Sequence, residues 1–388
     1  MTKNFFIGAL VPNEVKLPGI HGLRAVAALA VLFEHIVGSI IYLPPSAPTE
    51  WQRALLDLAG TGVHLFFVLS AFSLANSTHL TRDGIAEYGI KRFFRIAPLY
   101  YAMVVFQQIW QGPQGIAQNI LNFSFLFNLT PAAAPGIVYG GWTIGVEMLF
   151  YAALPIILLT CRSLRSVAVL VAGGFVVSWA AHEVILADPG SRISVLQNYA
   201  ALSFATNIGA FCAGLLAFSL YREFAGNQRV AKVALILAAG MLAVLVSSPL
   251  LYGIYAPGRP AVLLLFLIYG LVCLSQATNP SWLMANAAMQ HIGERSFSLY
   301  LVQIPVILTV MPAYTGIMAH LGGPSTLSYL ACAVLTVSAV LIVSNLTYHL
   351  IEIPGVNIGR RVLERRRAFR SYRADTSVPH VQVSGAEP

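Results

Sequence analysis

Residues 22–35 read GLRAVAALAVLFEH, an apolar stretch with a basic residue, Arg24, near its start and a histidine, His35, at its end. In an α-helix, eleven steps of about 100° return almost to the starting angle, so Arg24 and His35 share one face about 16 Å apart. The apolar run from residue 23 to about residue 43 is long enough to cross a hydrocarbon core about 30 Å thick. With Arg24 at one edge of that core, His35 lies near its middle, where a titratable side chain indicates a functional site.

The composition predicts the same environment for the rest of the chain. Of its 388 residues, 57% are hydrophobic and only 10% are charged, whereas soluble domains carry about 25% charged residues. The mean hydropathy of +0.73 agrees. We therefore predict an all-α polytopic membrane protein. Its four cysteines lie far apart without a CxxC pair, so the sequence predicts neither a metal site nor a disulfide framework.

Apolar runs of spanning length predict about ten transmembrane helices. The expected ranges are 23–43, 57–78, 96–111, 142–160, 166–187, 202–221, 231–248, 260–278, 296–316 and 326–350, the third being the shortest. With both termini cytoplasmic, 20 of the 23 lysines and arginines lie on the cytoplasmic side, and only Arg53, Arg192 and Arg259 lie on the other. This asymmetry fits the positive-inside rule, and an odd number of helices would break it.

The chain is expected to have three parts: a cytoplasmic N-terminal segment at 1–22, a transmembrane domain at 23–354 and a basic cytoplasmic tail at 355–388 that is partly disordered. The arginines of the tail are expected to bind anionic lipid headgroups. On the other face, residues 111–141 contain the apolar patch NILNFSFLFNL. Because Asn119, Asn122 and Asn128 interrupt this patch, it favours a re-entrant or interfacial extracytoplasmic segment over a span.

Arg24 and His35 each have a second interpretation. Arg24 is also what a positive-inside anchor looks like, with its long side chain reaching back to the headgroups. His35 is also what a ring that hydrogen-bonds a carbonyl at a helix kink looks like, although its depth favours a functional site. Glu34 points about 100° away from His35, which favours a partner on a neighbouring helix.

A second group lies in KRFFRIAPLYY, residues 91–101, where the chain enters the membrane from the cytoplasm. Arg92 and Arg95 are three residues apart, so they share one face of a helical turn and together suit phosphate oxygens. Pro98 suits the first turn of the following helix. The alternative for both arginines is again positive-inside anchoring.

A third group lies in GWTIGVEMLFY, residues 141–151. Glu147 is about 8 Å inside the extracytoplasmic end of its helix, and by the same count His35 is about 14 Å inside. The two differ in depth by only about 6 Å, which predicts a general base and the carboxylate that orients it. A structural ion pair with an arginine is the alternative for Glu147. His64, in GVHLFFVLSAF, enters at about the same depth as Glu147.

Five segments of the chain, GLRAVAALAVLFEH, GVHLFFVLSAF, KRFFRIAPLYY, WTIGVEMLFY and RSFSLYLVQIP, occur in this order. Together, over residues 17–354, they resemble the acyltransferase family 3 of integral membrane proteins. The resemblance implies that the membrane domain moves an acyl group, commonly acetyl, from cytoplasmic acyl-CoA to a hydroxyl of a glycan or lipid-linked sugar. It also implies a multi-pass protein of the bacterial inner (plasma) membrane that modifies the cell envelope, without a metal or a nucleic-acid partner.

The resemblance also implies roles for individual residues. His35 matches the catalytic histidine, and Arg24, Arg92 and Arg95 match arginines that hold the CoA phosphates. Glu147 matches an acid after the tryptophan motif. His64 stands where an acid is common, and Gln303 replaces a frequent histidine, so no proton transfer is assigned to Gln303. The further candidates for substrate binding or for stabilising an oxyanion are Glu34, His64, Ser70, Trp142, Ser298 and Tyr300.

As a hypothesis, His35 acts as general base on the acceptor hydroxyl and is oriented by Glu147 or Glu34. A covalent acyl-histidine is an alternative step. A transporter or flippase for a lipid-linked sugar is the rival function, because it too would have about ten spans with buried His and Glu. Against it, the two halves of the chain show no matching pair of interrupted helices. The sequence leaves the acceptor and the oligomeric state open.

Overall fold

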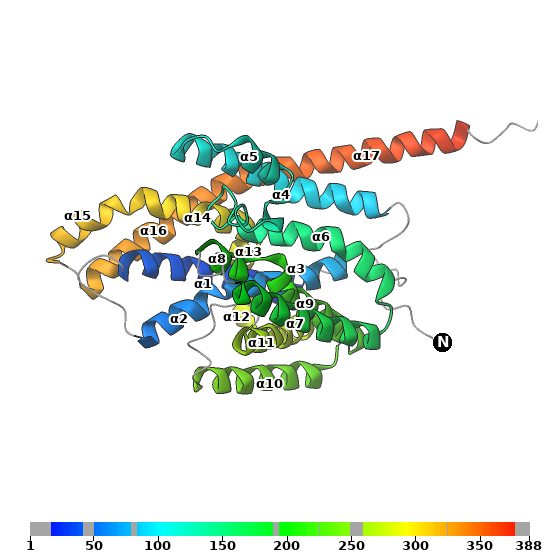
Figure 1. Ribbon diagram of the computed structural model, residues 1–388, viewed down its shortest axis with the longest axis horizontal. Coiled ribbons are helices and arrows are strands. Elements are labelled where there is room, and N and C mark those ends of the chain that lie inside the picture. The colour runs from blue at the N-terminus through cyan, green and yellow to red at the C-terminus, as the bar shows by residue number, and fades with distance from the viewer. Residues whose placement is uncertain are drawn as a thin grey trace, which may run out of the picture.

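The computed structural model describes residues 17–41, 50–78, 84–188, 194–224, 226–248, 259–323 and 325–376. Within these ranges the chain is built of helices and contains no strand, so the predicted all-α class is confirmed (Figure 1). In chain order the helices are α1 (Pro18–Ile41), α2 (Glu50–Gly60), α3 (Gly62–Ser77), α4 (Gly84–Gln111), α5 (Ile116–Phe123), the 3-10 turn η1 (Phe127–Leu129), α6 (Trp142–Thr160), α7 (Leu164–Ala187), α8 (Ser194–Leu202), α9 (Phe204–Glu223), α10 (Gln228–Val246), α11 (Pro260–Thr278), α12 (Trp282–Ala285), α13 (Ala287–Glu294), α14 (Ser296–Val310), α15 (Pro312–His320), α16 (Thr326–Thr347), the π-turn η4 (Tyr348–Glu352) and α17 (Ile353–Thr376).

Eight stretches of the described chain are long and apolar enough to cross a membrane, and the pair α14 and α15, bent by 56°, makes a ninth. The bend coincides with Pro312 at the start of α15, as expected where a proline removes a helix donor. α4 covers the third predicted span and is a further long helix, but its first half is charged. A polytopic membrane protein is therefore confirmed, with α4 as the helix of mixed character.

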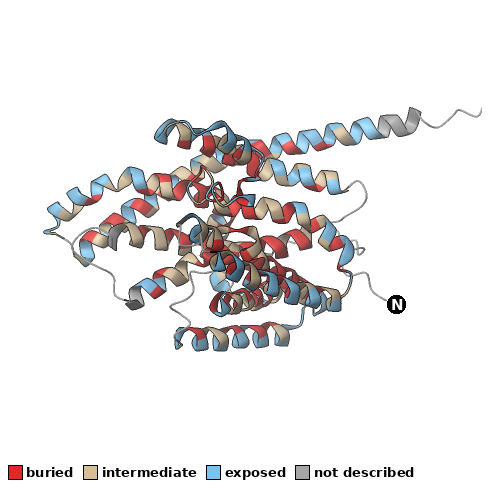
Figure 2. Ribbon diagram, in the orientation of Figure 1, coloured by how far each residue is buried: buried red, intermediate tan, exposed pale blue. Residues whose placement is uncertain are grey.

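The centre of the bundle is α3, which is surrounded by α1, α9 and α11. Residues buried within the protein make up 72% of the most apolar window of the α2–α3 span and 61% of that of α11, but only 22% in α7 and α10. Figure 2 shows the same contrast, with α10 pale on its outer face at the edge of the bundle. An apolar helix exposed in this way is stable only in lipid, so α7 and α10 lie at the membrane-facing surface.

Small residues let the central helices approach closely, as is usual in membrane bundles. A Cβ atom added to Gly214 of α9 would lie 2.2 Å from the carbonyl oxygen of Val68 on α3. Near the N-terminal end of α1, a Cβ atom on Gly22 would lie 2.2 Å from the carbonyl oxygen of Met284 on α12. At both points the backbone of a glycine lies directly against the backbone of a neighbouring helix. A side chain there would clash, so α1 and α9 are packed tightly against their neighbours.

Several predicted boundaries are wrong in instructive ways. α1 begins at Pro18, five residues before the predicted start of the first span, because proline suits the first turn of a helix. α4 begins at Gly84, twelve residues before the predicted start, and continues through Pro98. The predicted interfacial segment is confirmed as non-spanning: it holds the short helix α5 and a 3-10 turn, with Asn122 and Asn128 buried.

The basic part of the tail is helical, and the helix continues as far as Thr376. The polar end, which the sequence predicts to be disordered after Arg373, lies almost wholly in residues 377–388, outside the described ranges. α17 packs on α4, where Gly355 lies against Pro98 and Gly359 against Phe94. Farther out, the Arg367 guanidinium donates two hydrogen bonds to Glu87, at 2.9 and 2.6 Å. This guanidinium lowers the pKa of Glu87, so the carboxylate and the contact are favoured together.

The close contact at Gly214 leads to the first prediction. Gly214→Ala is expected to lower the thermal unfolding temperature by several degrees, since overpacking of this kind costs about 1–3 kcal/mol. Gly240 of α10 is the matched control, because a Cβ atom there meets nothing within 4 Å. Gly240→Ala is expected to leave the unfolding temperature in detergent unchanged or to raise it. Equal effects of the two substitutions would contradict the close packing of α9 on α3.

Candidate active site

Two cavities lie next to each other inside the bundle. The first, named here the arginine cavity, has a volume of about 110 Å³ and is lined by residues of α1, α3, α4, α6 and α14. The second, named the histidine cavity, has a volume of about 150 Å³ and is lined by residues of α1, α2, α3, α8 and the start of α6. Val63 and Tyr300 line both cavities. The two spaces are therefore neighbours that share one wall.

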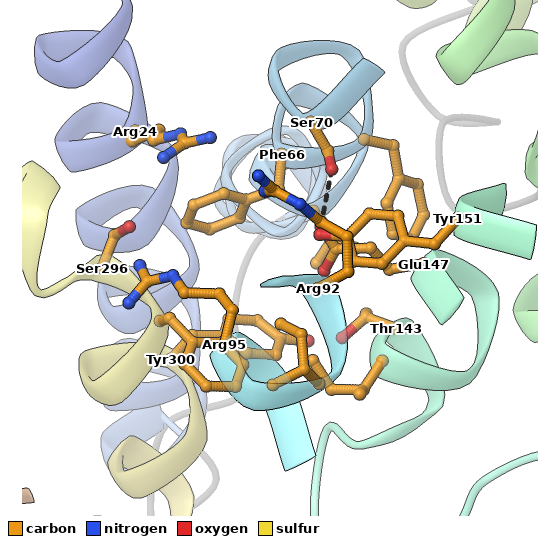
Figure 3. Close-up of a pocket in the computed structure, with 15 residues that line it drawn as sticks. Arg24, Phe66, Ser70, Arg92, Arg95, Thr143, Glu147, Tyr151, Ser296 and Tyr300 are labelled. Carbon is orange, nitrogen blue, oxygen red and sulfur yellow. Dashed lines mark hydrogen bonds between the residues drawn. The ribbon is translucent and has the colours of Figure 1, made fainter. Parts of the chain in front are cut away.

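The arginine cavity brings together the three arginines that the sequence singles out. Arg24 enters from α1, and Arg92 and Arg95 enter from successive turns of α4. Figure 3 shows their guanidinium groups turned toward one common space. Among the described residues, no carboxylate lies within 4 Å of Arg24 or Arg92. Positive charge concentrated in an apolar bundle predicts an anionic ligand.

Glu147 is the one acidic residue that lines the arginine cavity. Its carboxylate accepts a hydrogen bond from Ser70 Oγ at 2.6 Å, drawn as a dashed line in Figure 3, and another from the Tyr151 hydroxyl. These two donors fix the orientation of the carboxylate. Ser70, a candidate oxyanion donor, is thus engaged with Glu147 in this structure.

Arg95 has a partner that the sequence analysis missed. Its guanidinium pairs with Glu352, whose side chain is fully buried and also accepts a 2.6 Å hydrogen bond from Ser298 Oγ. Glu352 is the last residue of the π-turn between α16 and α17, and π-turns are frequent at functional sites. Its signal in the sequence is an acid beside Pro354 at the basic end of the last span. Ser298 therefore acts on Arg95 through Glu352 and lines neither cavity.

His35 lies in the histidine cavity, and its nearest carboxylate is that of Glu34. His35 Nε2 is 3.2 Å from Glu34 Oε2, so the expectation that Glu34 turns away from His35 is wrong. Both side chains bend toward the same cavity, and a long glutamate can reach the distal nitrogen of a neighbouring ring. With an N–H on Nε2 directed to Glu34, Nδ1 is left as the basic nitrogen. His35 Nδ1 makes no hydrogen bond, and the buried Gln303 lies beside the ring.

His64 lies in the same cavity and is only 7% exposed. Neither of its ring nitrogens makes a hydrogen bond; Asn207 is close to the ring but outside hydrogen-bond geometry. The ring packs against Phe67 and Phe266. Trp142, at the start of α6, lines the cavity as well. A buried ring with two unused nitrogens facing a cavity is suited to binding a polar ligand.

Tyr300 stands between the two cavities. Its hydroxyl donates a 3.1 Å hydrogen bond to the carbonyl oxygen of Gly140, and its ring packs edge-on against Phe66. Gly140 has a φ of +70°, a conformation that favours glycine. Tyr300 and Val63 therefore form the wall through which a reacting group would have to pass from one cavity to the other.

The predicted site residues fall into two sets. Arg24, Arg92, Arg95, Ser70 and Glu147 line the arginine cavity. His35, Glu34, His64 and Trp142 line the histidine cavity. Glu147 and His35 thus line different cavities, so Glu34 rather than Glu147 is the carboxylate in contact with His35.

The histidine cavity also contains Asp57 of α2, which the sequence analysis did not single out. No metal-binding group of three or more His, Cys, Asp or Glu residues occurs in the described ranges.

The fold and the cavities define a multi-pass membrane protein with an arginine-lined cavity beside a cavity that contains a histidine. A family model described as an acyltransferase domain matches residues 17–345. The chain belongs to this family of membrane acyltransferases, and the resemblance seen in its sequence motifs is confirmed.

Two relatives illustrate the range of the family. The acyltransferase MdmB of Streptomyces mycarofaciens is 26% identical over 385 residues, covering 92% of this chain and 95% of the relative. The peptidoglycan O-acetyltransferase OatA of Listeria monocytogenes is 25% identical over 372 residues, covering 87% of this chain but only 55% of the relative. The chain therefore spans nearly all of the first relative and about half of the second. No solved structure matches it significantly.

The buried pair of Glu352 and Arg95 leads to the second prediction. Glu352→Gln keeps the shape of the side chain but leaves Arg95 without its counter-charge, which is expected to cost about 3 kcal/mol of unfolding free energy. Glu294 is the matched control, since it pairs with Arg295 at 3.8 Å at the surface; Glu294→Gln is expected to cost about 0–1 kcal/mol. Thermal unfolding in detergent measures both. If Arg95→Gln combined with Glu352→Gln is no more stable than the sum of the single losses predicts, the two side chains are not coupled.

Proposed function

We propose that this acyltransferase moves an acetyl group from cytoplasmic acetyl-CoA to a hydroxyl of an extracytoplasmic or lipid-linked glycan, with His35 as general base. The observation that carries the proposal is the shared wall. A cavity rich in arginine and a cavity with a carboxylate-bound histidine meet at Tyr300 and Val63. A donor with a charged head and a reactive tail fits the first cavity, and a hydroxyl nucleophile fits the second.

The arginine cavity suits the phosphates of acetyl-CoA. Three guanidinium groups face one space that contains a single carboxylate, Glu147, so bound phosphate would restore the charge balance. Arg95 is held in place by Glu352, and Arg24 and Arg92 have no carboxylate within 4 Å among the described residues. Arg24 and Arg92 are therefore the arginines with most to gain from an anion. The positive-inside rule places this cavity on the cytoplasmic side.

The chemistry at His35 follows from its contacts. Glu34 holds Nε2, and Nδ1 removes the proton of the acceptor hydroxyl as its oxygen bonds to the thioester carbonyl carbon. The carbon–sulfur bond then breaks, and the proton passes from His35 to the thiolate that leaves. The Tyr300 hydroxyl lies at the wall between the cavities. By exchanging its hydrogen bond to the Gly140 carbonyl for one to the substrate, it would stabilise the negative carbonyl oxygen formed on the way.

The third prediction concerns Arg92. In acetyl-transfer assays with labelled acetyl-CoA, Arg92→Gln is expected to raise the KM for acetyl-CoA at least about tenfold while kcat changes little, because binding energy is lost equally from ground state and transition state. The same variant is expected to lose the rise in unfolding temperature that CoA gives the wild type. Lys91→Gln is the matched control, since Lys91 is the preceding residue of α4, is exposed and does not line the cavity. An unchanged KM for Arg92→Gln would refute the phosphate assignment.

The fourth prediction concerns the base and its orienting carboxylate. His35→Ala is expected to lower kcat by about 10²–10⁴, the range for loss of a general base. Glu34→Gln is expected to lower kcat by a smaller factor with little change in the KM for acetyl-CoA. Glu183→Gln is the control, because Glu183 is exposed, lines neither cavity and pairs with another histidine, His182. A His35→Ala protein in proteoliposomes with the wild-type rate would rule out His35 as the base.

A further inference from the structure

The charge of the histidine cavity is opposite to that of the arginine cavity. Two carboxylates line it, Glu34 and Asp57, and no lysine or arginine of the described chain does. Glu34 pairs with His35. Asp57 and Glu34 are close enough to repel each other electrostatically. The pair of Glu34 with His35 therefore does not balance the charge of Asp57.

The nearest basic residue on the same helix, Arg53, balances the charge of Asp57 only in part. Arg53, one turn earlier on α2, attracts the carboxylate electrostatically, but it is exposed, does not line the cavity and forms no ion pair with Asp57 within 4 Å. A carboxylate beside another carboxylate in a partly desolvated space is stabilised by a cation. Asp57 therefore favours a positive group in this cavity.

A second observation points to a ligand in the same place. The His64 ring is buried, lines the cavity and leaves both of its nitrogens outside hydrogen-bond geometry, with the Asn207 side chain beside the ring. Buried polar atoms in native proteins are almost always paired. The two ring nitrogens can accept a hydroxyl proton on one side and donate to a hydroxyl oxygen on the other. His64 thus supplies the contact that a hydroxyl-bearing acceptor needs, while Asp57 supplies the charge.

We infer that the acceptor of this enzyme is a hydroxyl compound that also carries a protonated amine, such as an amino sugar with a free amino group. Asp57 binds the ammonium group, His64 binds a hydroxyl, and His35 faces the hydroxyl that reacts. This inference rests on the proposed acetyl transfer, and it goes further by naming the class of acceptor. Acceptors with a phosphate or carboxylate beside the reacting hydroxyl are disfavoured, because they would face Asp57 and Glu34.

Three glycosides test the inference: octyl β-glucoside, octyl β-glucosaminide, which has an amine in place of the C2 hydroxyl, and octyl β-glucuronide, which has a carboxylate at C6. They are neutral, cationic and anionic at slightly acidic pH, and they share the chain and the ring. With the protein in nanodiscs and labelled acetyl-CoA, kcat/KM for the glucosaminide is expected to exceed that for the glucoside at least about tenfold, the value of one hydrogen bond to a charged group. The glucuronide is expected to be the poorest acceptor.

The variants assign this preference to Asp57. Asp57→Asn is expected to bring the ratio of kcat/KM for the glucosaminide to kcat/KM for the glucoside close to one, and Asp57→Glu is expected to retain the preference for the glucosaminide. Glu183→Gln, which removes an exposed acid outside the cavity, is expected to change nothing. A wild-type preference for the glucoside, or a ratio that Asp57→Asn leaves unchanged, overturns the inference and leaves the acetyl transfer standing.

Binding separates this inference from the proposed function. If none of the three glycosides is acetylated, the proposed acetyl transfer fails for these acceptors. The rise in unfolding temperature that each glycoside gives on its own still measures binding to the histidine cavity. Stabilisation by the glucosaminide that Asp57→Asn abolishes supports the amine site. Equal stabilisation by all three glycosides, or none by the glucosaminide, overturns it.

Discussion

A charge inside an apolar bundle is stable only when another group compensates it, and this constraint determines where the functional residues of this protein lie. Glu352 is compensated by Arg95 and Ser298, and Glu147 by Ser70 and Tyr151. Both of these acids are therefore already engaged by neighbouring side chains. Among the described residues, Arg24 and Arg92 have no carboxylate within 4 Å, and Arg24 interacts with Glu147 only at longer range. This uneven compensation is the basis for proposing that the arginine cavity binds an anion.

The same constraint connects the C-terminal helices α16 and α17 to the arginine cavity. Glu352 lies where α16 gives way to α17, and it reaches back to Arg95 in the middle of α4. Farther along, α17 packs on α4 through Gly355 and Gly359 and through the pair of Arg367 with Glu87. The arginines of α17 predict binding to lipid headgroups, and the contacts of this helix show that it holds α4 in position. The orientation of Arg95 in the arginine cavity depends on a segment more than 250 residues away in the sequence.

The sequence predicts the parts of this structure that depend on local periodicity. The shared face of Arg24 and His35 and the pairing of Arg92 with Arg95 on one side of α4 follow from 3.6 residues per turn, and both hold. The start of α4 is missed because its charged first half has no hydropathy signal. Glu352 is missed because its partner comes from another helix and its position depends on a π-turn. The contact of Glu34 with His35 is missed because helical angles give the direction in which each side chain leaves the backbone. They do not give the position of the terminal atoms of a long, flexible side chain such as that of Glu34.

α1 is the element that places the two chemistries at a fixed separation. Ala25, Ala27 and Ala28 are completely buried, and Gly22 touches the backbone of α12, so α1 can neither tilt nor slide without a clash. Arg24 therefore remains in the arginine cavity and His35 in the histidine cavity, about 16 Å apart along the axis. For the proposed transfer, a donor held by its phosphates near Arg24 must extend past Tyr300 and Val63 to reach His35. The length of the donor, and not a movement of α1, has to cover that distance, which makes the wall formed by Tyr300 and Val63 the part of the site that must open.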